Sequence, residues 1–111
     1  METEKQILAH AKKTAKELGL RFIRIAMRPG VEVGWADSFI LGPNKNLLAL
    51  ETKRPGKEAT PIQIERGKTV VQYGFAWAKC DSKADVDFTL INFAKQSVGQ
   101  PLMTREEFEA L

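Results

Sequence analysis

Two short apolar runs separated by turn-forming residues constrain the fold of this chain more than any other feature. The runs are residues 38–41 and 47–50, and the five residues between them, GPNKN, favour a turn. Two strands joined by such a spacer predict a β-hairpin. If the turn is centred near Asn44, then Asp37 at the start of the first strand lies opposite Glu51 at the end of the second.

The residues before the hairpin predict a helix and then a strand. Thr3 and Gln6 form a capping box, and Gly19 marks the end of the helix. Residues 21–28 then alternate with a period of two, which predicts a half-buried strand that ends at Pro29. The predicted inward residues of the helix are Ile7, Leu8, Ala11, Ala15 and Leu18, and those of the strand are Ile23, Ile25 and Met27.

A second helix start follows the hairpin. Thr60 is a suitable N-cap, Pro61 suits the first helical position, and Gln63 completes a capping box. We expect this helix to run to Tyr73, with Gly74 after it. Gly67 inside the helix costs about 1 kcal/mol relative to alanine, which suggests a close approach to DNA or to another helix.

The remaining residues complete a single domain over residues 1–111. Residues 75–80 predict another strand, and Trp77 within it is expected in the core. Residues 82–93 are compatible with a capped helix or with an extended segment, and Thr104 with Glu107 predicts a short last helix. The order is helix, three strands, helix and strand with a helical C-terminal tail, which is an α/β fold.

Composition narrows the classes of site and compartment. The 111 residues carry a formal charge of +3, which is compatible with a polyanionic partner. Cys80 is the only cysteine and His10 the only histidine, so the sequence predicts no disulfide, no zinc site of the usual kind and a cytoplasmic protein. Cys80 is expected to be a buried apolar residue. No segment has membrane-spanning length and hydropathy, so we expect no membrane partner.

The hairpin groups charged side chains that can perform chemistry. Residues two apart on a strand share a face, so Glu51 and Lys53 point the same way, and Asp37 faces them. Two facing carboxylates repel each other, and Mg²⁺ or Mn²⁺ together with Lys53 would supply the opposite charge. The alternative is that Asp37 ends a loop and that Glu51 and Lys53 form an ordinary solvated strand face.

Three combined motifs resemble a known nuclease family. GWAD, the hairpin, and ETKRPGKEATPIQ are similar to the VRR-NUC domain, a branch of the PD-(D/E)XK superfamily, and the similarity runs over residues 4–80. The resemblance implies a restriction-endonuclease-like αβββαβ core. Three positions depart from the family pattern: no proline precedes Asp37, Ser38 replaces a basic residue, and Thr52 replaces an apolar one.

The resemblance implies catalytic roles for five residues. Asp37 and Glu51 would bind the metal with the backbone carbonyl of Thr52, and Lys53 would be the catalytic lysine. Gln63 would reach toward the metal-bound water or the phosphate, and Glu4 would complete the acidic cluster. Both have a simpler explanation, because Gln63 also fits a helix cap and an acid at Glu4 favours the helix dipole.

The resemblance also implies DNA as the substrate and a divalent-metal-dependent endonuclease as the activity. Small members resemble phage-type enzymes that cut branched DNA such as four-way (Holliday) junctions, and two symmetric cuts favour a homodimer. The alternatives are a non-catalytic DNA-binding module and a nuclease for flaps, nicks or RNA. The residues expected to contact nucleic acid are Arg24, Arg28, Trp35, Arg54, Lys57 and Arg66, with Lys68 beside them. Trp35 is also compatible with an ordinary core position.

Overall fold

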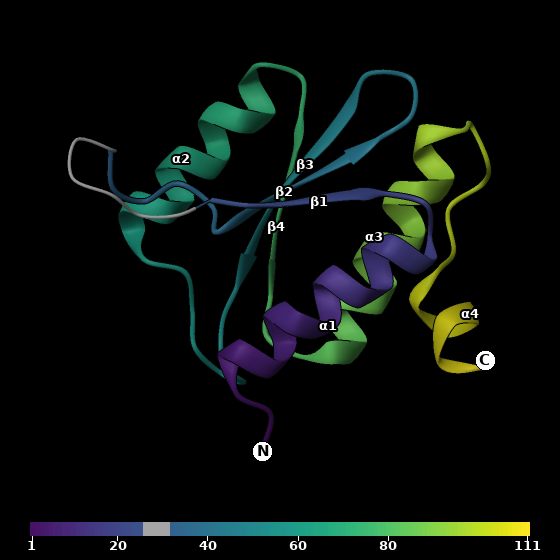
Figure 1. The fold of residues 1–111 in the computed structure, drawn as a ribbon, viewed down its shortest axis with the longest axis horizontal. Coiled ribbons are helices and arrows are strands. Elements are labelled where there is room, and N and C mark those ends of the chain that lie inside the picture. Colours follow the sequence, from purple (N-terminus) through teal and green to yellow (C-terminus); the bar gives the residue numbers. More distant parts are fainter. Residues whose placement is uncertain (26–31) are drawn as a thin grey trace.

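The computed structural model describes residues 1–25 and 32–111. Within them a mixed sheet lies between helices, and Figure 1 shows α2 on one side of the sheet and α1 and α3 on the other. In chain order the elements are α1 (Glu4–Glu17), β1 (Arg21–Arg24), β2 (Ser38–Gly42), β3 (Asn46–Thr52), α2 (Pro61–Gln72), β4 (Ala76–Cys80), α3 (Lys83–Ser97) and α4 (Arg105–Glu109). This order confirms the predicted αβββαβ core with a helical C-terminal tail.

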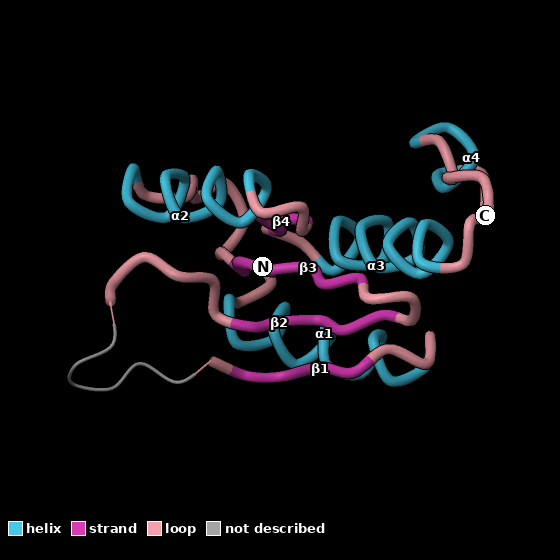
Figure 2. Tube along the Cα trace, turned by 90° about the horizontal axis from the view of Figure 1, so that it is seen from above, coloured by secondary structure: helices cyan, strands magenta, loops and turns pink. Residues whose placement is uncertain are grey.

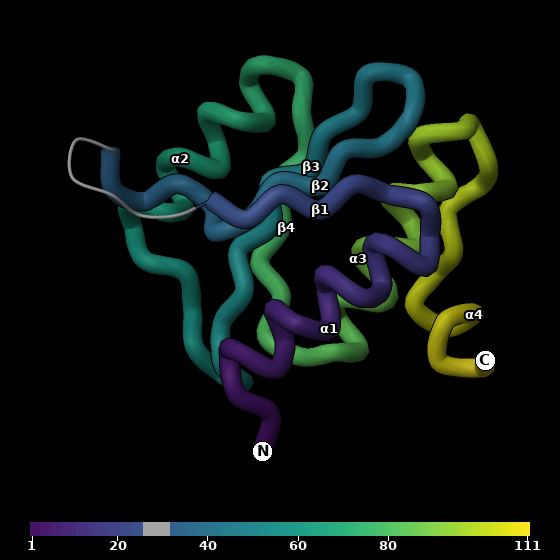
Figure 3. The backbone as a smooth tube through the Cα atoms, viewed as in Figure 1, coloured from purple at the N-terminus to yellow at the C-terminus, as the bar shows by residue number. Residues whose placement is uncertain are grey.

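The four strands follow one another across the sheet in sequence order, as Figure 2 shows. β1, β2 and β3 are antiparallel neighbours, whereas β4 is parallel to β3. The parallel pair needs a crossover, and α2 supplies it (Figure 3). The hairpin register is the predicted one, because Ser38 pairs with Leu50 and Gly42 pairs with Asn46. Asp37 immediately precedes Ser38, so the same register places it opposite Glu51.

Local sequence signals explain where the helices begin and end. All three predicted capping boxes are present: Thr3 with Gln6 at α1, Thr60 with Gln63 at α2, and Thr104 with Glu107 at α4. The hairpin turn places Asn44 and Lys45 at positive φ, 60° and 64°. Asparagine tolerates this conformation better than most residues. The segment after residue 82 is helical, which decides between the two predicted alternatives.

The core lies between the sheet and the helices α1 and α3, which pack on one face of it. Ile7, Ile40, Leu50 and Leu90 are fully buried there, and Cys80 joins them as predicted. Burial raises the pKa of the Cys80 thiol to about 11, so the thiol stays protonated near neutral pH. None of the helices in residues 1–25 and 32–111 combines the length and the apolar character needed to cross a membrane.

The predicted phase of the first strand is wrong. Phe22 packs against the core, whereas Ile23 is 38% exposed. β1 is an edge strand, and α2 packs on β4 at the opposite edge of the sheet, so the second face of β1 has little cover. The predictions for Met27, Arg28 and Pro29 fall on residues 26–31, outside the described residues.

Among the described residues, Gly67 faces the sheet and not another helix. A Cβ at Gly67 would lie 2.6 Å from Cδ2 of the Trp77 indole on β4. The missing side chain therefore lets α2 pack directly on the sheet. Trp77 is half-buried beneath α2 instead of lying in the main core.

Candidate metal and nucleic-acid site

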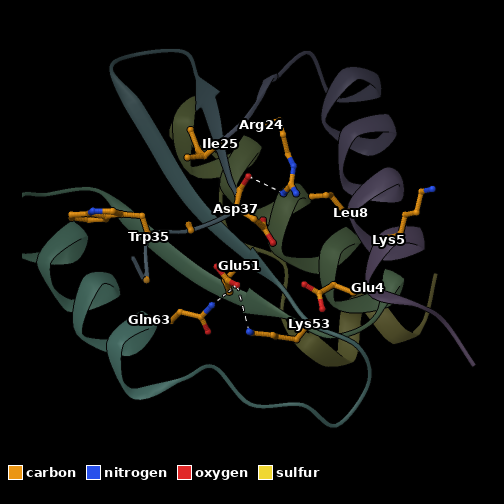
Figure 4. A pocket seen from close by; sticks show the side chains of 12 residues that line it. Glu4, Lys5, Leu8, Arg24, Ile25, Trp35, Asp37, Glu51, Lys53 and Gln63 are labelled. Atoms are coloured by element: carbon orange, nitrogen blue, oxygen red, sulfur yellow. Dashed lines mark hydrogen bonds and ion pairs between the residues drawn. The ribbon is translucent and has the colours of Figure 1, made fainter. Parts of the chain in front are cut away.

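An open cleft of about 780 Å³ lies where the start of α1, the end of β1, the end of β3 and the start of α2 meet. Asp37, Glu51, Lys53, Gln63 and Glu4 all line it. Figure 4 shows the carboxylates of Asp37, Glu51 and Glu4 pointing into the same space. The structure thus brings together all five side chains predicted for catalysis.

Asp37 precedes β2 and is held from one side by Thr52 of β3. The Thr52 backbone N–H and the Thr52 hydroxyl both donate to Asp37 Oδ2, at 3.1 and 2.7 Å. The Arg24 guanidinium donates to the Asp37 main-chain carbonyl at 3.1 Å. Burial raises the pKa of Asp37, whereas the Thr52 hydrogen bonds and the charge of Arg24 act in the opposite direction.

Glu51 is a buried carboxyl group whose ionised form is disfavoured by its surroundings. Glu51 is only 4% exposed. Among residues 1–25 and 32–111, its Oε2 is the one buried side-chain oxygen or nitrogen that has no hydrogen-bond partner. Burial, and after it the charge of Asp37, raises the pKa of Glu51 to about 7, and Lys53 opposes this shift. A buried carboxylate oxygen without a partner is costly, and a bound cation would satisfy it.

Lys53 and Gln63 both contact the other oxygen of Glu51. Lys53 Nζ lies 3.7 Å from Glu51 Oε1, and the Lys53 side chain is 7% exposed. Gln63 Nε2 donates to the same oxygen at 2.9 Å, while Gln63 Oε1 accepts from the Thr60 N–H at 2.9 Å. The Gln63 amide therefore completes the predicted helix cap and also contacts Glu51 in the cleft.

The donor atoms fit a hard divalent cation. Asp37 and Glu51 offer carboxylate oxygens, and the Thr52 carbonyl points to the same side of β3 as its N–H, which faces Asp37. Mg²⁺ is commonly held by one or two carboxylates and keeps several waters. Within the described ranges no three His, Cys, Asp or Glu side chains form a ready-made cage. The residues thus fit a cation that keeps part of its water shell.

The residues predicted to contact nucleic acid do not all lie in the cleft. Arg24 and Trp35 line the cleft. Arg54 and Lys57 line another hollow, of about 540 Å³, on the connection after β3. Arg66 does not line the cleft but contacts Glu32 and Trp35, and Arg28 lies outside the described residues.

Two side chains contribute to this site in ways that the sequence did not predict. Lys5 lines the cleft beside Glu4, and only its place next to a predicted site residue could have indicated this. The Thr52 side chain orients Asp37, although Thr52 was predicted to contribute its carbonyl alone. That hydroxyl depends on the departure from the family pattern at this position, since an apolar side chain could not donate a hydrogen bond.

Comparison with known proteins places the fold. No family model matches the sequence, and no curated protein matches it either. A solved VRR-NUC domain superposes with a TM-score of 0.69 at 21% identity, covering 81% of this chain and 96% of that chain. A second structure, a VRR-NUC domain protein, has a TM-score of 0.69 at 20% identity and covers 85% and 89%. The chain therefore has the fold of the VRR-NUC domain.

Proposed function

We propose that this protein is a divalent-metal-dependent endonuclease that hydrolyses phosphodiester bonds in DNA. The observation that carries the proposal is the convergence of Asp37, Glu51 and Lys53 in one open cleft, with a buried Glu51 oxygen that has no partner among the described residues. The VRR-NUC fold supports the proposal. The sequence motif that predicts roles for these residues resembles the motif of the same domain.

Asp37, Glu51 and the Thr52 carbonyl would hold Mg²⁺ or Mn²⁺. Such an ion, when bound, lowers the pKa of a coordinated water and stabilises the charge of a leaving oxygen. Hydrogen bonds within the chain orient the two carboxylates. Thr52 holds Asp37 through two hydrogen bonds, and Gln63 holds Glu51 through one. Side chains fixed in this way keep two carboxylates aimed at one point despite their repulsion.

Lys53 acts on the attacking water and on the charge that develops on the phosphate. Its buried ammonium lies beside Glu51, so it cannot swing freely into solvent. A fixed positive charge is most useful for catalysis where water is largely excluded. Arg24 and Lys5 line the same cleft and would neutralise phosphates of the entering strand.

Glu4 extends the acidic cluster from α1. Its carboxylate points into the cleft in Figure 4, and its charge contributes to the raised pKa of both Asp37 and Glu51. This third carboxylate would add negative charge that favours a bound cation in the cleft.

The substrate we propose is branched DNA, including four-way junctions, and the active form is a homodimer. A four-way junction needs two symmetric cuts, and the described residues of each copy form one cleft lined by Asp37, Glu51 and Lys53. A two-fold symmetric pair is the common way to supply two equivalent sites. The basic net charge of +3 favours a polyanionic partner in general.

The direct test is cleavage of matched linear, flap, four-way and RNA substrates in Mg²⁺, Mn²⁺ or EDTA. Wild type is run beside Lys53→Ala and beside Lys13→Ala, an exposed lysine of α1 outside the cleft lining. We expect metal-dependent cutting of branched DNA by wild type and by Lys13→Ala. Lys53→Ala should cut about 10²–10³-fold more slowly.

Other outcomes would redirect the proposal. DNA binding without any metal-dependent cutting would favour a non-catalytic DNA-binding module. Preferential cutting of the RNA or of linear DNA would keep the chemistry but reject branched DNA as the substrate. Equal rates for Lys53→Ala and Lys13→Ala would reject the role of Lys53.

A further inference from the structure

Trp35 occupies an unusual place for a large aromatic residue. It lies two residues before Asp37, lines the same cleft as Asp37 and Glu51, and is half-buried. Figure 4 shows the indole reaching away from the carboxylates, on the α2 side of the cleft. A core tryptophan would be covered on all sides, so this indole has a surface left for a ligand.

Arg66 and Glu32 hold the indole in this position. The Arg66 guanidinium lies over the indole ring, 5.1 Å from its centroid. Glu32 Oε2 accepts from the Trp35 Nε1–H at 3.2 Å and lies 3.5 Å from Arg66 Nη2. Arg66 Nε also donates to the Val33 carbonyl at 3.2 Å. The ring is therefore covered by a cation on one side and tied at its N–H edge.

The loop that carries Trp35 is seated directly on α2. Gly34 has φ +88°, and a Cβ there would lie 2.7 Å from Cγ1 and 3.2 Å from the carbonyl carbon of Ile62. Ile62 neighbours Gln63, which contacts Glu51. The indole is thus fixed relative to the carboxylates before any ligand arrives, which lowers the entropic cost of binding.

The charges of this group favour a flat ring as the ligand over a phosphate. The Arg66 charge is already paired with Glu32, so this arginine offers little to a phosphate. An indole offers a π-face, and every nucleobase has one to stack on it. A base inside a duplex has both faces covered by its neighbours, so only an unpaired or displaced base can use the indole.

We infer that Trp35, held by Arg66 and Glu32, stacks on an unpaired nucleobase of the DNA strand that enters the cleft. This rests on the proposed nuclease function and deepens it, because it names what the cleft recognises in branched DNA. Because Trp35 and Asp37 line the same cleft, the stacked nucleotide belongs to the strand that occupies the cleft.

The test uses 2-aminopurine placed at the unpaired position of a flap, and the same base in a duplex of the same sequence. Binding is measured in EDTA with Lys53→Ala protein, so that no cleavage intervenes. We expect the flap probe to be quenched on binding and the duplex probe to change little. Trp35→Leu should abolish the quenching and weaken flap binding about 5- to 150-fold, with little change for the duplex.

Three further variants separate stacking from a structural role. Trp35→Phe keeps an aromatic face and should keep most of the quenching and affinity. Arg66→Lys keeps the charge but lacks the planar guanidinium, and it should weaken the quenching. Tyr73→Leu removes an aromatic side chain that is 77% exposed outside the cleft lining, and it should match the parent protein.

Two results would overturn the inference. One is equal flap binding and equal quenching for Trp35→Leu and the parent, and the other is an equal loss of flap and duplex binding. A failure of the nuclease proposal is distinguishable, because wild type would then cut no DNA while the binding comparison still reports whether a base stacks on Trp35.

Discussion

Glu51 is a buried carboxyl group that is energetically costly to ionise in the folded protein. It is almost fully buried, faces Asp37, and has one oxygen without a hydrogen-bond partner within the described part of the chain. The raised pKa, about 7, expresses the cost of ionising it there. A residue that destabilises the metal-free fold in this way is retained where it performs a function, and binding a cation is the function that would remove the cost.

This cost predicts a specific pH dependence for the metal-free protein. The pKa of Glu51 is higher in the folded chain than in the unfolded chain, so folding favours the protonated form. The free energy of unfolding should therefore fall as pH rises from about 5 to about 7, with a slope of up to about 1.4 kcal/mol per pH unit, and then level off. Asp37 shifts in the same direction and adds to the fall.

Urea unfolding in EDTA at several pH values measures this dependence. The matched variant is Glu51→Gln, which keeps the size and the hydrogen-bond acceptor for Gln63 but cannot ionise. Its stability should change less over the same range than that of the wild type. Identical pH profiles for the two proteins would show that Glu51 is not the group responsible.

At the scale of elements, the start of α2 combines a helix cap with a site contact. The Gln63 side chain accepts from the Thr60 N–H and donates to Glu51, while the Thr60 hydroxyl accepts from the Gln63 N–H. A single amide thus ties the helix end to the carboxylate on β3. The position of α2 and the orientation of Glu51 are consequently linked.

Two variants of this helix start should separate stability from activity. Thr60→Ala removes the cap hydroxyl and should cost about 1 kcal/mol of stability while leaving cleavage close to normal. Gln63→Glu keeps a cap acceptor but replaces the donor to Glu51 with a carboxylate, so cleavage should fall at least about tenfold. Urea unfolding and single-turnover cleavage measure the two effects. A larger loss of cleavage for Thr60→Ala than for Gln63→Glu would contradict this assignment.

The elements also show how far sequence reasoning reaches. The capping boxes and the hairpin turn are local, so the helix starts and the pairing of Ser38 with Leu50 followed from spacing alone. The phase of β1 did not, because Phe22 and Ile23 are both apolar and only the cover from neighbouring helices decides which is buried. The contact of Arg66 with Trp35 joins α2 to the loop before β2, and no local sequence pattern predicts it.

At the scale of the whole molecule, α2 leaves an apolar surface uncovered. Ile64 and Val71 of α2 are 43% and 57% exposed, and they line a hollow of about 320 Å³ between α2 and Trp77. Exposed apolar patches of this kind often mark protein interfaces. This surface is where we place the contact of the proposed homodimer.

Replacing one residue of this surface tests the dimer. Val71→Glu puts a charge at the edge of the hollow, where Val71 is 57% exposed. We expect it to shift the protein toward the monomer in sedimentation analysis. Val98→Glu makes the same change at a 52% exposed valine after α3 and should leave the dimer intact. A monomeric wild type, or equal dissociation by both variants, would reject α2 as the interface.

The most direct test of the central claim compares wild type with Glu51→Gln on one labelled four-way junction in Mn²⁺. The account predicts that wild type cuts the junction and that EDTA stops it. Glu51→Gln should lose cleavage by about 10² or more, yet be at least as stable as wild type in EDTA at pH 8. Cleavage by Glu51→Gln at the wild-type rate, or no cleavage by wild type, would contradict a metal-dependent nuclease centred on Glu51.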